Sequence, residues 1–236
     1  MATIAILGAT GRTGRILVRQ ALTRGHDVTA VIRPGSQPTS RPTVETRSTM
    51  RPVHPAADAS SGVRSIEQSA FPAAVATIVA DPTDPAALTA LRGHDVVISA
   101  LGATGRGPAT IYSRSAEALI TASAPGSRVL VISSAGIEVP ASAGPGTRLA
   151  GRLLYRLMRG TYDDMARMEE LLAASELRWT AVRPTRLVDG PAGTPRVSLG
   201  ATAPVGSTTR RADLAMYLLD AIDDPHTYRL PVAVSS

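Results

Sequence analysis

Short apolar runs alternate with longer segments in which apolar residues recur at helical spacing, and this rhythm continues along most of the chain. A short and nearly continuous apolar run is typical of a strand that is buried on both faces of a sheet. Seven such strands are predicted, over residues 4–7, 28–32, 77–80, 96–100, 129–132, 179–182 and 230–234.

The segments between these runs predict helices. Ile16, Leu17, Ala21 and Leu22 share one helical face, and Gly25 follows them as a C-terminal stop signal. Strands that alternate with helices indicate an α/β fold with a doubly wound parallel sheet of the Rossmann type, covered on both faces. By the same reasoning, helices are predicted over residues 13–24, 85–91, 112–123, 163–175 and 211–220.

The length of 236 residues suits one substantial domain, so we expect residues 1–236 to fold as a single unit. Within that unit, residues 185–236 are expected to form a small C-terminal portion on the substrate side. Residues 36–72 break the rhythm, because they are rich in Ser, Thr, Pro, Ala and Arg and show little periodicity. They predict a flexible surface insertion, with a lid that closes over a bound ligand as the alternative.

A glycine-rich turn, GATGRTG, follows the first predicted strand. Gly8 permits a tight turn, Gly11 lets the backbone approach a pyrophosphate, and Gly14 lets the next helix pack closely on the strand. The N-terminus of that helix offers free N–H groups and a partial positive charge to phosphates. Although the spacing is GxxGxxG rather than the commoner GxGxxG, its strand–turn–helix setting indicates a dinucleotide-binding unit.

The residue that ends the second strand indicates which dinucleotide is bound. An acidic residue there would favour the free ribose hydroxyl of NAD, but this chain has Arg33 in the stretch VTAVIRP. A guanidinium suits a 2′-phosphate through charged hydrogen bonds, and Arg12 in the glycine turn offers a second cation. The sequence therefore predicts NADP(H) as the cofactor in preference to NAD(H).

Composition excludes several kinds of chemistry. All 25 cationic residues are arginine, so the chain has no Schiff-base lysine, no Walker lysine and no lysine beside a catalytic tyrosine. Cysteine is absent, which removes disulfides, thiol nucleophiles and thiolate ligands. The four histidines are isolated from one another, so we expect no metal site.

The charge pattern bears on possible partners. The net charge of +6 comes from scattered arginines, and one Phe and one Trp give few rings for stacking bases, so we expect no nucleic-acid partner. No apolar run has transmembrane length, and the first strand begins too early to leave room for a signal peptide. We therefore expect no membrane partner and a cytoplasmic location.

Taken together, several motifs resemble those of one family. The chain is similar to the atypical short-chain dehydrogenase/reductases, and within them to the NAD(P)H-binding, NmrA-like proteins close to the biliverdin reductase B or flavin reductase subgroup. The resemblance covers nearly the whole chain apart from residues 36–72. Its motifs are IAILGATGRTGRILVRQAL, VTAVIRP, VADPTDPAAL, DVVISALGA, VLVISSAG and MEELLAASELRWTAVRPTRLVDG.

This resemblance implies a set of cofactor contacts. Arg33 would meet the 2′-phosphate and Asp81 the adenine amino group, although Pro82 lacks the backbone N–H that the family usually offers to adenine. The pyrophosphate would be wrapped by Gly8, Thr10, Gly11, Arg12, Thr13 and Gly14, and the nicotinamide side would be lined by Leu101, Gly102, Ser133, Ser134 and Pro184.

The resemblance also indicates where a proton donor would stand. Flavin-reductase-like relatives carry a serine after the fifth strand, matched here by Ser134, and a histidine on the helix before the sixth, where this chain has Glu169. Glu169 would serve as an acid in a buried setting, and Tyr162 is a further candidate donor. Tyr155 lies in YRLMR, which copies the YxxxK spacing with an arginine that does not shuttle protons. The candidate catalytic residues are therefore Ser134, Tyr162 and Glu169.

These observations predict an NADPH-dependent oxidoreductase that transfers hydride to a small flavin-like, quinone-like or secondary-metabolite acceptor, because the cofactor itself carries the hydride chemistry. Two alternatives stay open: an NmrA-like protein that senses NADP(H) without turnover, and a non-redox isomerase, dehydratase or cyclase of a biosynthetic pathway. The expected partner is a small-molecule substrate, shaped by loops over residues 102–110, 136–161 and 186–207. The chain is expected to be a monomer or a weak homodimer.

Overall fold

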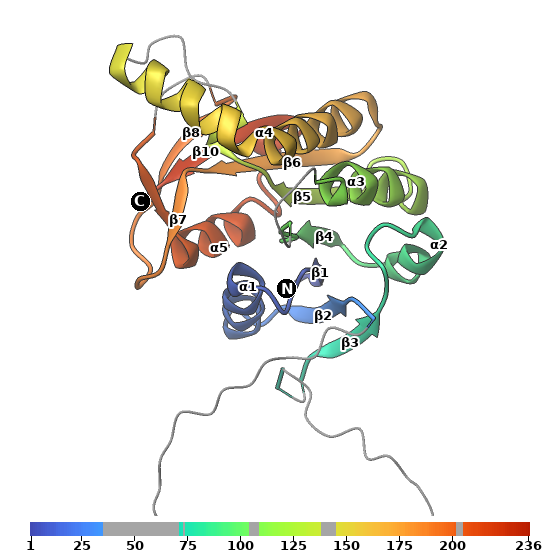
Figure 1. Ribbon diagram of the computed structural model, residues 1–236. Helices are drawn as coiled ribbons and strands as arrows, with labels where there is room; N and C mark the ends of the chain where they lie inside the picture. The colour runs from blue at the N-terminus through green and yellow to red at the C-terminus, as the bar shows by residue number, and fades with distance from the viewer. Residues whose placement is uncertain (35–70, 73, 104–108, 138–144, 202–204) are drawn as a thin grey trace, which may run out of the picture.

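A single large sheet forms the centre of the molecule (Figure 1). The computed structural model describes residues 1–34, 71–72, 74–103, 109–137, 145–201 and 205–236, with only the backbone described at residues 145, 147–154 and 157. Eight strands follow the order β3-β2-β1-β4-β5-β6-β10-β8. They are β1 (Thr3–Leu7), β2 (Asp27–Ile32), β3 (Ala76–Val79), β4 (Val96–Ser99), β5 (Arg128–Ile132), β6 (Arg178–Pro184), β8 (Arg196–Leu199) and β10 (Leu230–Ser235).

Neighbouring strands of this sheet run parallel, except that β8 is antiparallel to β10. At the centre, Ile6 of β1 lies in register with Ala30 of β2 on one side and with Ile98 of β4 on the other. The strand order reverses between β1 and β4, and ligands of such sheets bind beyond the carboxyl ends of the strands at this point. A second, two-stranded sheet pairs β7 (Arg186–Val188) with β9 (Thr208–Arg210).

Helices cover both faces of the large sheet (Figure 1). One face is covered by α1 (Arg12–Thr23) and α5 (Arg211–Asp220), and the other by α2 (Pro85–Leu88), α3 (Ile111–Ala122) and α4 (Pro145–Ala174). Short 3-10 helices in the described segments are η1 (Thr89–Leu91), η2 (Ala135–Ile137) and η3 (Pro225–Thr227).

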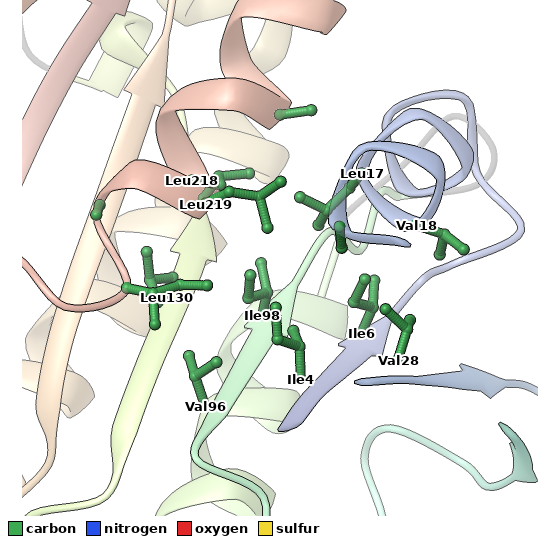
Figure 2. Packing of buried hydrophobic residues seen from close by; sticks show 14 of the residues in the cluster. Ile4, Ile6, Leu17, Val18, Val28, Val96, Ile98, Leu130, Leu218 and Leu219 are labelled. Atoms are coloured by element: carbon green, nitrogen blue, oxygen red, sulfur yellow. The ribbon is translucent and has the colours of Figure 1, made fainter. Parts of the chain in front are cut away.

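Burial on both faces explains why the strands read as continuous apolar runs. Successive side chains of a strand point to opposite faces. Ile4 and Ile6 therefore join the cluster beneath α1 and α5, which includes Leu17 and Leu218 (Figure 2). Leu7 joins the second cluster, on the side of α3 and α4. Complete burial of one such side chain stabilises the fold by about 1.5–3 kcal/mol.

The architecture confirms the predicted doubly wound α/β sheet, and each of the seven predicted strands is present within two residues of its expected bounds. The edge strand β8 and the pair β7 and β9 were not predicted, because their segments, RVSL, RLV and TTR, contain polar residues and form no continuous apolar run. The segment over residues 36–72 lies outside the described residues except for Phe71 and Pro72, and the Phe71 side chain is buried in the core.

One helix differs clearly from the expectation. It was predicted to begin at residue 163, but α4 begins at Pro145, so the loop expected over residues 136–161 is wrong for residues 145–161. The first part of this helix was not predicted because it contains Gly146, Gly151 and Gly160, and each glycine disfavours a helix by about 1 kcal/mol relative to alanine. Arginine and leucine dominate the rest of the stretch and favour a helix.

Two glycines set the distance between α1 and the sheet. Gly8 has a φ of +74°, and a Cβ there would lie 2.6 Å from the carbonyl oxygen of Ala100, which follows β4. A Cβ on Gly14 would collide with the Gly8 carbonyl oxygen and lie 2.8 Å from the Cα of Ala9. The first turn of α1 is therefore in direct backbone contact with the turn that follows β1.

A carboxylate from α4 caps the start of α3. Thr110, the N-cap residue of α3, makes no side-chain bond to the helix. Instead, the buried Asp164 accepts hydrogen bonds from the backbone N–H groups of Tyr112 and Ser113, at 3.0 and 3.3 Å, and from the Ser113 hydroxyl at 2.5 Å. These bonds satisfy N–H groups that a helix leaves unpaired, and they hold Tyr112 next to α4.

We expect Gly14→Ala to lower the free energy of unfolding by about 2 kcal/mol, because the added methyl group meets backbone atoms that cannot move aside. Urea unfolding followed by circular dichroism measures the change. The matched control is Gly102→Ala, where a Cβ meets no atom within 4 Å and stability should change by less than about 0.5 kcal/mol. Equal effects of the two substitutions would contradict the packing assigned to Gly14.

We also expect Asp164→Ala to lower the free energy of unfolding by about 2 kcal/mol, since it removes a helix cap and leaves buried donors unpaired. Asp163→Ala is the control, because the neighbouring Asp163 is exposed and its contacts with Tyr155 and Arg159 lie at the surface. That control should change stability by less than about 1 kcal/mol. A loss no greater for Asp164 than for Asp163 would rule out the capping role.

Candidate functional site

The glycine turn presents the N-terminus of α1 to a cavity. Gly11 is the N-cap residue of α1, and no side chain caps the helix there in the described part of the chain. The Gly11 N–H donates to the Gly8 carbonyl at 3.0 Å and closes the turn. The next residues, Arg12 and Thr13, line the cavity with the first turn of the helix. Such a helix start attracts anions through its unpaired N–H groups and its dipole.

A cavity of about 600 Å³ lies beyond the carboxyl ends of the central strands. Arg33 follows β2 and Ser133 follows β5, and these strands lie on opposite sides of β1 and β4, so the two residues mark opposite ends of the cavity. The end at Ser133 is mainly apolar. Its lining there includes Leu101, Ile132, Met165 and Leu187.

A second hollow of about 290 Å³ adjoins the first and shares Arg33 and Gly102 with it. Asp81, Thr83, Thr110 and Arg114 complete its polar lining. The backbone N–H and the hydroxyl of Thr83 both donate to Asp81 Oδ1 at 2.8 Å, and these bonds lower the pKa of the Asp81 carboxyl below its usual value against slight opposition from burial. The positive charges of Arg114 and Arg33 lower this pKa further. The hollow thus combines an ionised carboxylate with two cations.

An acidic residue bridges two arginines of the cavity wall. Arg12 and Arg211 both line the cavity, and the Asp189 carboxylate forms ion pairs with both, at 2.9 Å in the case of Arg211. Arg211 is the first residue of α5, so the bridge joins the glycine turn to the C-terminal part of the chain. Arg12 and Asp189 are largely exposed, and an exposed pair of this kind contributes little to stability.

Two buried polar residues, Ser133 and Glu169, form a hydrogen-bonded chain with the partly buried Arg183 behind the apolar end of the cavity. The Ser133 hydroxyl donates to Glu169 Oε1 at 2.6 Å. Arg183 of β6 donates through Nη2 to Glu169 Oε2 at 2.6 Å, and through Nε to both carboxylate oxygens at 3.1 and 3.2 Å. Glu169 is 8% exposed, which differs from the solvated position usual for a glutamate on a helix. The glutamate singled out from the sequence is therefore buried, ionically paired and bonded to a cavity residue.

The other two candidate catalytic residues lie elsewhere. Ser134 Oγ accepts a hydrogen bond from the Gly136 backbone N–H at 3.1 Å. The Tyr162 ring is buried, and its hydroxyl lies against Gly136, where an added Cβ would come within 2.5 Å of it. Among the described residues, the lining of the two hollows includes Ser133 but neither Ser134 nor Tyr162. Tyr155 also points elsewhere, since its hydroxyl donates to Asp163 at 2.5 Å.

One tyrosine in the cavity wall was not singled out from the sequence. Tyr112 lines the cavity, and its hydroxyl oxygen accepts the backbone N–H of Ala103 at 3.0 Å. Burial raises the pKa of Tyr112 above its ordinary value, the hydrogen bond from Ala103 opposes this shift, and the negative charge of Asp164 adds to it. The phenol therefore stays protonated at neutral pH and can donate a hydrogen bond. The sequence placed it near the start of the helix after the fourth strand, but nothing local distinguished it from other residues at helix starts.

Most of the residues predicted to bind the cofactor are brought together. Gly14 instead packs against the turn, Asp81 lines the adjoining hollow, and Pro184 is buried in β6 in register with Val234. Leu187 and Arg211 also reach the cavity from the C-terminal part of the chain, and no local sequence pattern marked them. The predicted residues that line the main cavity are Gly8, Thr10, Gly11, Arg12, Thr13, Arg33, Leu101, Gly102 and Ser133.

Among the described residues, no helix is both long enough and apolar enough to cross a membrane. Within the same residues, no cluster of three or more His, Cys, Asp or Glu side chains has the arrangement of a metal site.

Solved structures with similar folds come from several bacteria. A protein from Lactobacillus casei is 22% identical over 99% of both chains, with a TM-score of 0.72. A proposed NADH-flavin reductase from Streptococcus pneumoniae is 20% identical over the full length of both chains, with a TM-score of 0.68. A short-chain dehydrogenase/reductase from Veillonella parvula, solved in complex with NADP, is 19% identical over all of this chain and 94% of its own, with a TM-score of 0.66. At these identities the likeness is one of fold.

Comparison of sequences identifies the family. No curated protein matches the chain. The model of a family described as NAD(P)H-binding matches residues 53–225, nearly three quarters of the chain. The matched region contains β4, β5, β6 and the helices that pack beside them, while the glycine turn precedes it. Because it covers more than half of the chain, this match shows that the chain belongs to the NAD(P)H-binding family, in agreement with what its motifs predicted.

Proposed function

We propose that this protein is an NADPH-dependent reductase that acts on a small flavin-like, quinone-like or secondary-metabolite acceptor. The observation that carries the proposal is a single cavity with two different ends. One end has a helix N-terminus and arginines, which suit phosphates, and the other is apolar with a few polar groups, which suits a flat conjugated ring.

The residues present fit a dinucleotide. Added Cβ atoms at Gly8 or Gly14 would collide with backbone, so the turn keeps its shape only with glycine at these positions. The first turn of α1 and the side chains of Arg12 and Thr13 would hold the pyrophosphate. Arg211, which shares the Asp189 carboxylate with Arg12, would add a second cation. Because Asp189 occupies both guanidinium groups, phosphate binding at this place would exchange one anion for another.

A preference for NADP(H) is supported by the second hollow. Arg33 and Arg114 lie beside Asp81, and both contribute positive potential there. A 2′-phosphate at the end of β2 would meet this pair of arginines, whereas an NAD-specific site would place a carboxylate at the position of Arg33. The Veillonella parvula relative solved with NADP has the same fold and supports this choice.

The apolar end would orient the reacting rings. A bound nicotinamide would supply the hydride. Leu101, Ile132 and Met165 give this region an apolar lining, and Ser133 and Tyr112 line it with polar groups. Glu169 acts here as a positioning residue, because its carboxylate is already bonded to Arg183 and Ser133. The proposed NADH-flavin reductase from Streptococcus pneumoniae, which shares the fold, agrees with an acceptor of this type.

A protein that senses NADP(H) without turnover is the second candidate. It is favoured by one observation, namely that the acid predicted on α4 is held in an ion pair with Arg183. Hydride transfer to a flavin or a quinone demands orientation more than a strong acid, so this observation does not outweigh the shape of the cavity.

We expect the purified protein to oxidise NADPH in the presence of at least one member of a panel of flavins, quinones and enones. The loss of NADPH fluorescence measures the reaction. Tight NADPH binding without oxidation by any acceptor would overturn the reductase assignment in favour of the sensor. Conversion of an added compound without net consumption of NADPH would instead identify a non-redox enzyme.

We expect Arg33→Ala to weaken NADPH binding by roughly tenfold or more, since it removes a charged hydrogen bond to the 2′-phosphate. NADH binding should change by less than about twofold, because NADH has an uncharged 2′-hydroxyl in place of the phosphate at this position. Fluorescence titration with both cofactors makes the comparison. Arg19→Ala, at an exposed position on α1, is the control and should leave both affinities unchanged. Equal losses of NADPH and NADH affinity would rule out the role of Arg33.

A further inference from the structure

We propose that Ser133 presents a hydrogen-bond acceptor, and not a donor, to the cavity, so that the bound ligand places an N–H or O–H group against it. The inference rests on the proposed function, since it concerns the same cavity. It identifies Glu169 and Arg183 as the residues that set the polarity of Ser133.

The first step is the charge on Glu169. The Arg183 guanidinium contacts both carboxylate oxygens, at distances between 2.6 and 3.2 Å. The two side chains are only 11% and 10% exposed, so water screens this pair weakly. A guanidinium stays protonated in proteins and favours an ionised partner. Glu169 is therefore a carboxylate, which can accept hydrogen bonds and cannot donate them.

The second step is the proton of Ser133. Its Oγ lies 2.6 Å from Glu169 Oε1, a short distance that is typical of a hydroxyl donating to an anion. Because the carboxylate has no proton, the hydrogen in this bond belongs to Ser133. A hydroxyl has one proton and two lone pairs, so what the Ser133 oxygen keeps for the cavity are lone pairs.

The backbone holds this arrangement in place. The Ser133 N–H donates to the Val182 carbonyl at 2.8 Å, in continuation of the pairing between β5 and β6. Arg183 is the next residue of β6, and Glu169 comes from the buried face of α4. Ser133 is itself only 3% exposed. Rotation of its hydroxyl toward the cavity would remove the 2.6 Å hydrogen bond to Glu169 Oε1 and leave this buried oxygen with only the 3.1 Å bond from Arg183 Nε, which is costly.

The consequence is a rule for the ligand. An N–H or O–H group next to Ser133 finds an acceptor, whereas a carbonyl oxygen there meets lone pairs and is disfavoured. Two parts of the bound molecules have the required chemistry: the carboxamide NH₂ of the nicotinamide, and the imide N–H of a flavin-like acceptor. The two sources can be separated because each has an analogue that lacks the donor.

The first experiment compares NADP⁺ with its 3-acetylpyridine analogue, in which a methyl ketone replaces the carboxamide. Binding of each to the full-length protein is measured by calorimetry. If the carboxamide is the donor, NADP⁺ should bind about tenfold more tightly than the analogue, the size expected for one well-placed hydrogen bond. Ser133→Ala should reduce this ratio to less than about threefold.

The second experiment compares lumiflavin with 3-methyllumiflavin as acceptors for NADPH. If the flavin imide is the donor, kcat/KM should fall by about tenfold on methylation in the unmodified protein and by less than about threefold in Ser133→Ala. The 3-methyl group removes one donor and leaves the redox-active part of the ring intact.

Glu169→Gln tests the polarity directly. The glutamine oxygen would face Arg183, its NH₂ group would donate to Ser133, and the serine proton would then turn toward the cavity. The preference for the donor-bearing ligand should disappear or reverse. Glu170→Gln, at the adjacent exposed position, should keep the preference of the unmodified protein. Ser133→Ala leaves the buried Glu169–Arg183 pair intact, so the test stands even if Glu169→Gln does not fold.

The inference is supported if the unmodified protein prefers the donor-bearing member of either ligand pair and Ser133→Ala loses that preference. The pair that shows this effect identifies the donor. Normal NADP⁺ binding and NADPH turnover with no discrimination in either pair would overturn the inference alone. A preference unchanged by Ser133→Ala would also overturn it. Failure of NADP⁺ and NADPH to bind at all would overturn the proposed function, and the inference with it.

Discussion

The contact between Gly14 of α1 and the Gly8 carbonyl sets the geometry on which the site depends. It brings the start of the helix against the turn after β1, while Gly8 itself lies against the backbone that follows β4. No side chain fits in either contact. Because the first turn of α1, the turn after β1 and the residues after β4 meet without side chains between them, the unpaired N–H groups of the helix open onto the cavity beside the strand ends.

Arginine side chains are taken out of solvent at both ends of the strands β5 and β6, and they have different partners at the two ends. At the amino edge, the Arg128 guanidinium donates to the carbonyls of Ala221, Ile222 and Arg178 and lies 4.5 Å from the centre of the Tyr228 ring. Burial lowers the pKa of Arg128 to about 10, so its guanidinium stays charged at neutral pH. Its hydrogen bonds connect the start of β5 to the start of β6 and to the residues that follow α5. At the carboxyl edge, Arg183 is paired with a carboxylate that reaches the cavity through Ser133.

The parts of the site that came from local pattern were predictable. Gly8, Gly11 and Arg33 follow strands that a short apolar run reveals, and the structure places all three in one cavity wall. Arg211 is the first residue of α5 and Tyr112 the second residue of α3, but nothing local distinguishes them from other residues at helix starts. The first half of the long helix α4 was not predicted because its glycines disfavour a helix. The arginines and leucines around those glycines favour one, and packing stabilises it.

By itself, the sequence determined the order along the chain of the seven predicted strands and the helices between them, the glycine turn after β1, and the arginine after β2. Each of these features depends on residues that are close together in the chain. The tertiary structure alone decided the partners of Glu169. Ser133, Glu169 and Arg183 lie on three separate elements, and only the pairing of β5 with β6 and the packing of α4 bring their polar atoms within hydrogen-bonding distance. Because hydrogen-bond polarity depends on those partners, the chemistry of the apolar end could not be derived from residue types alone.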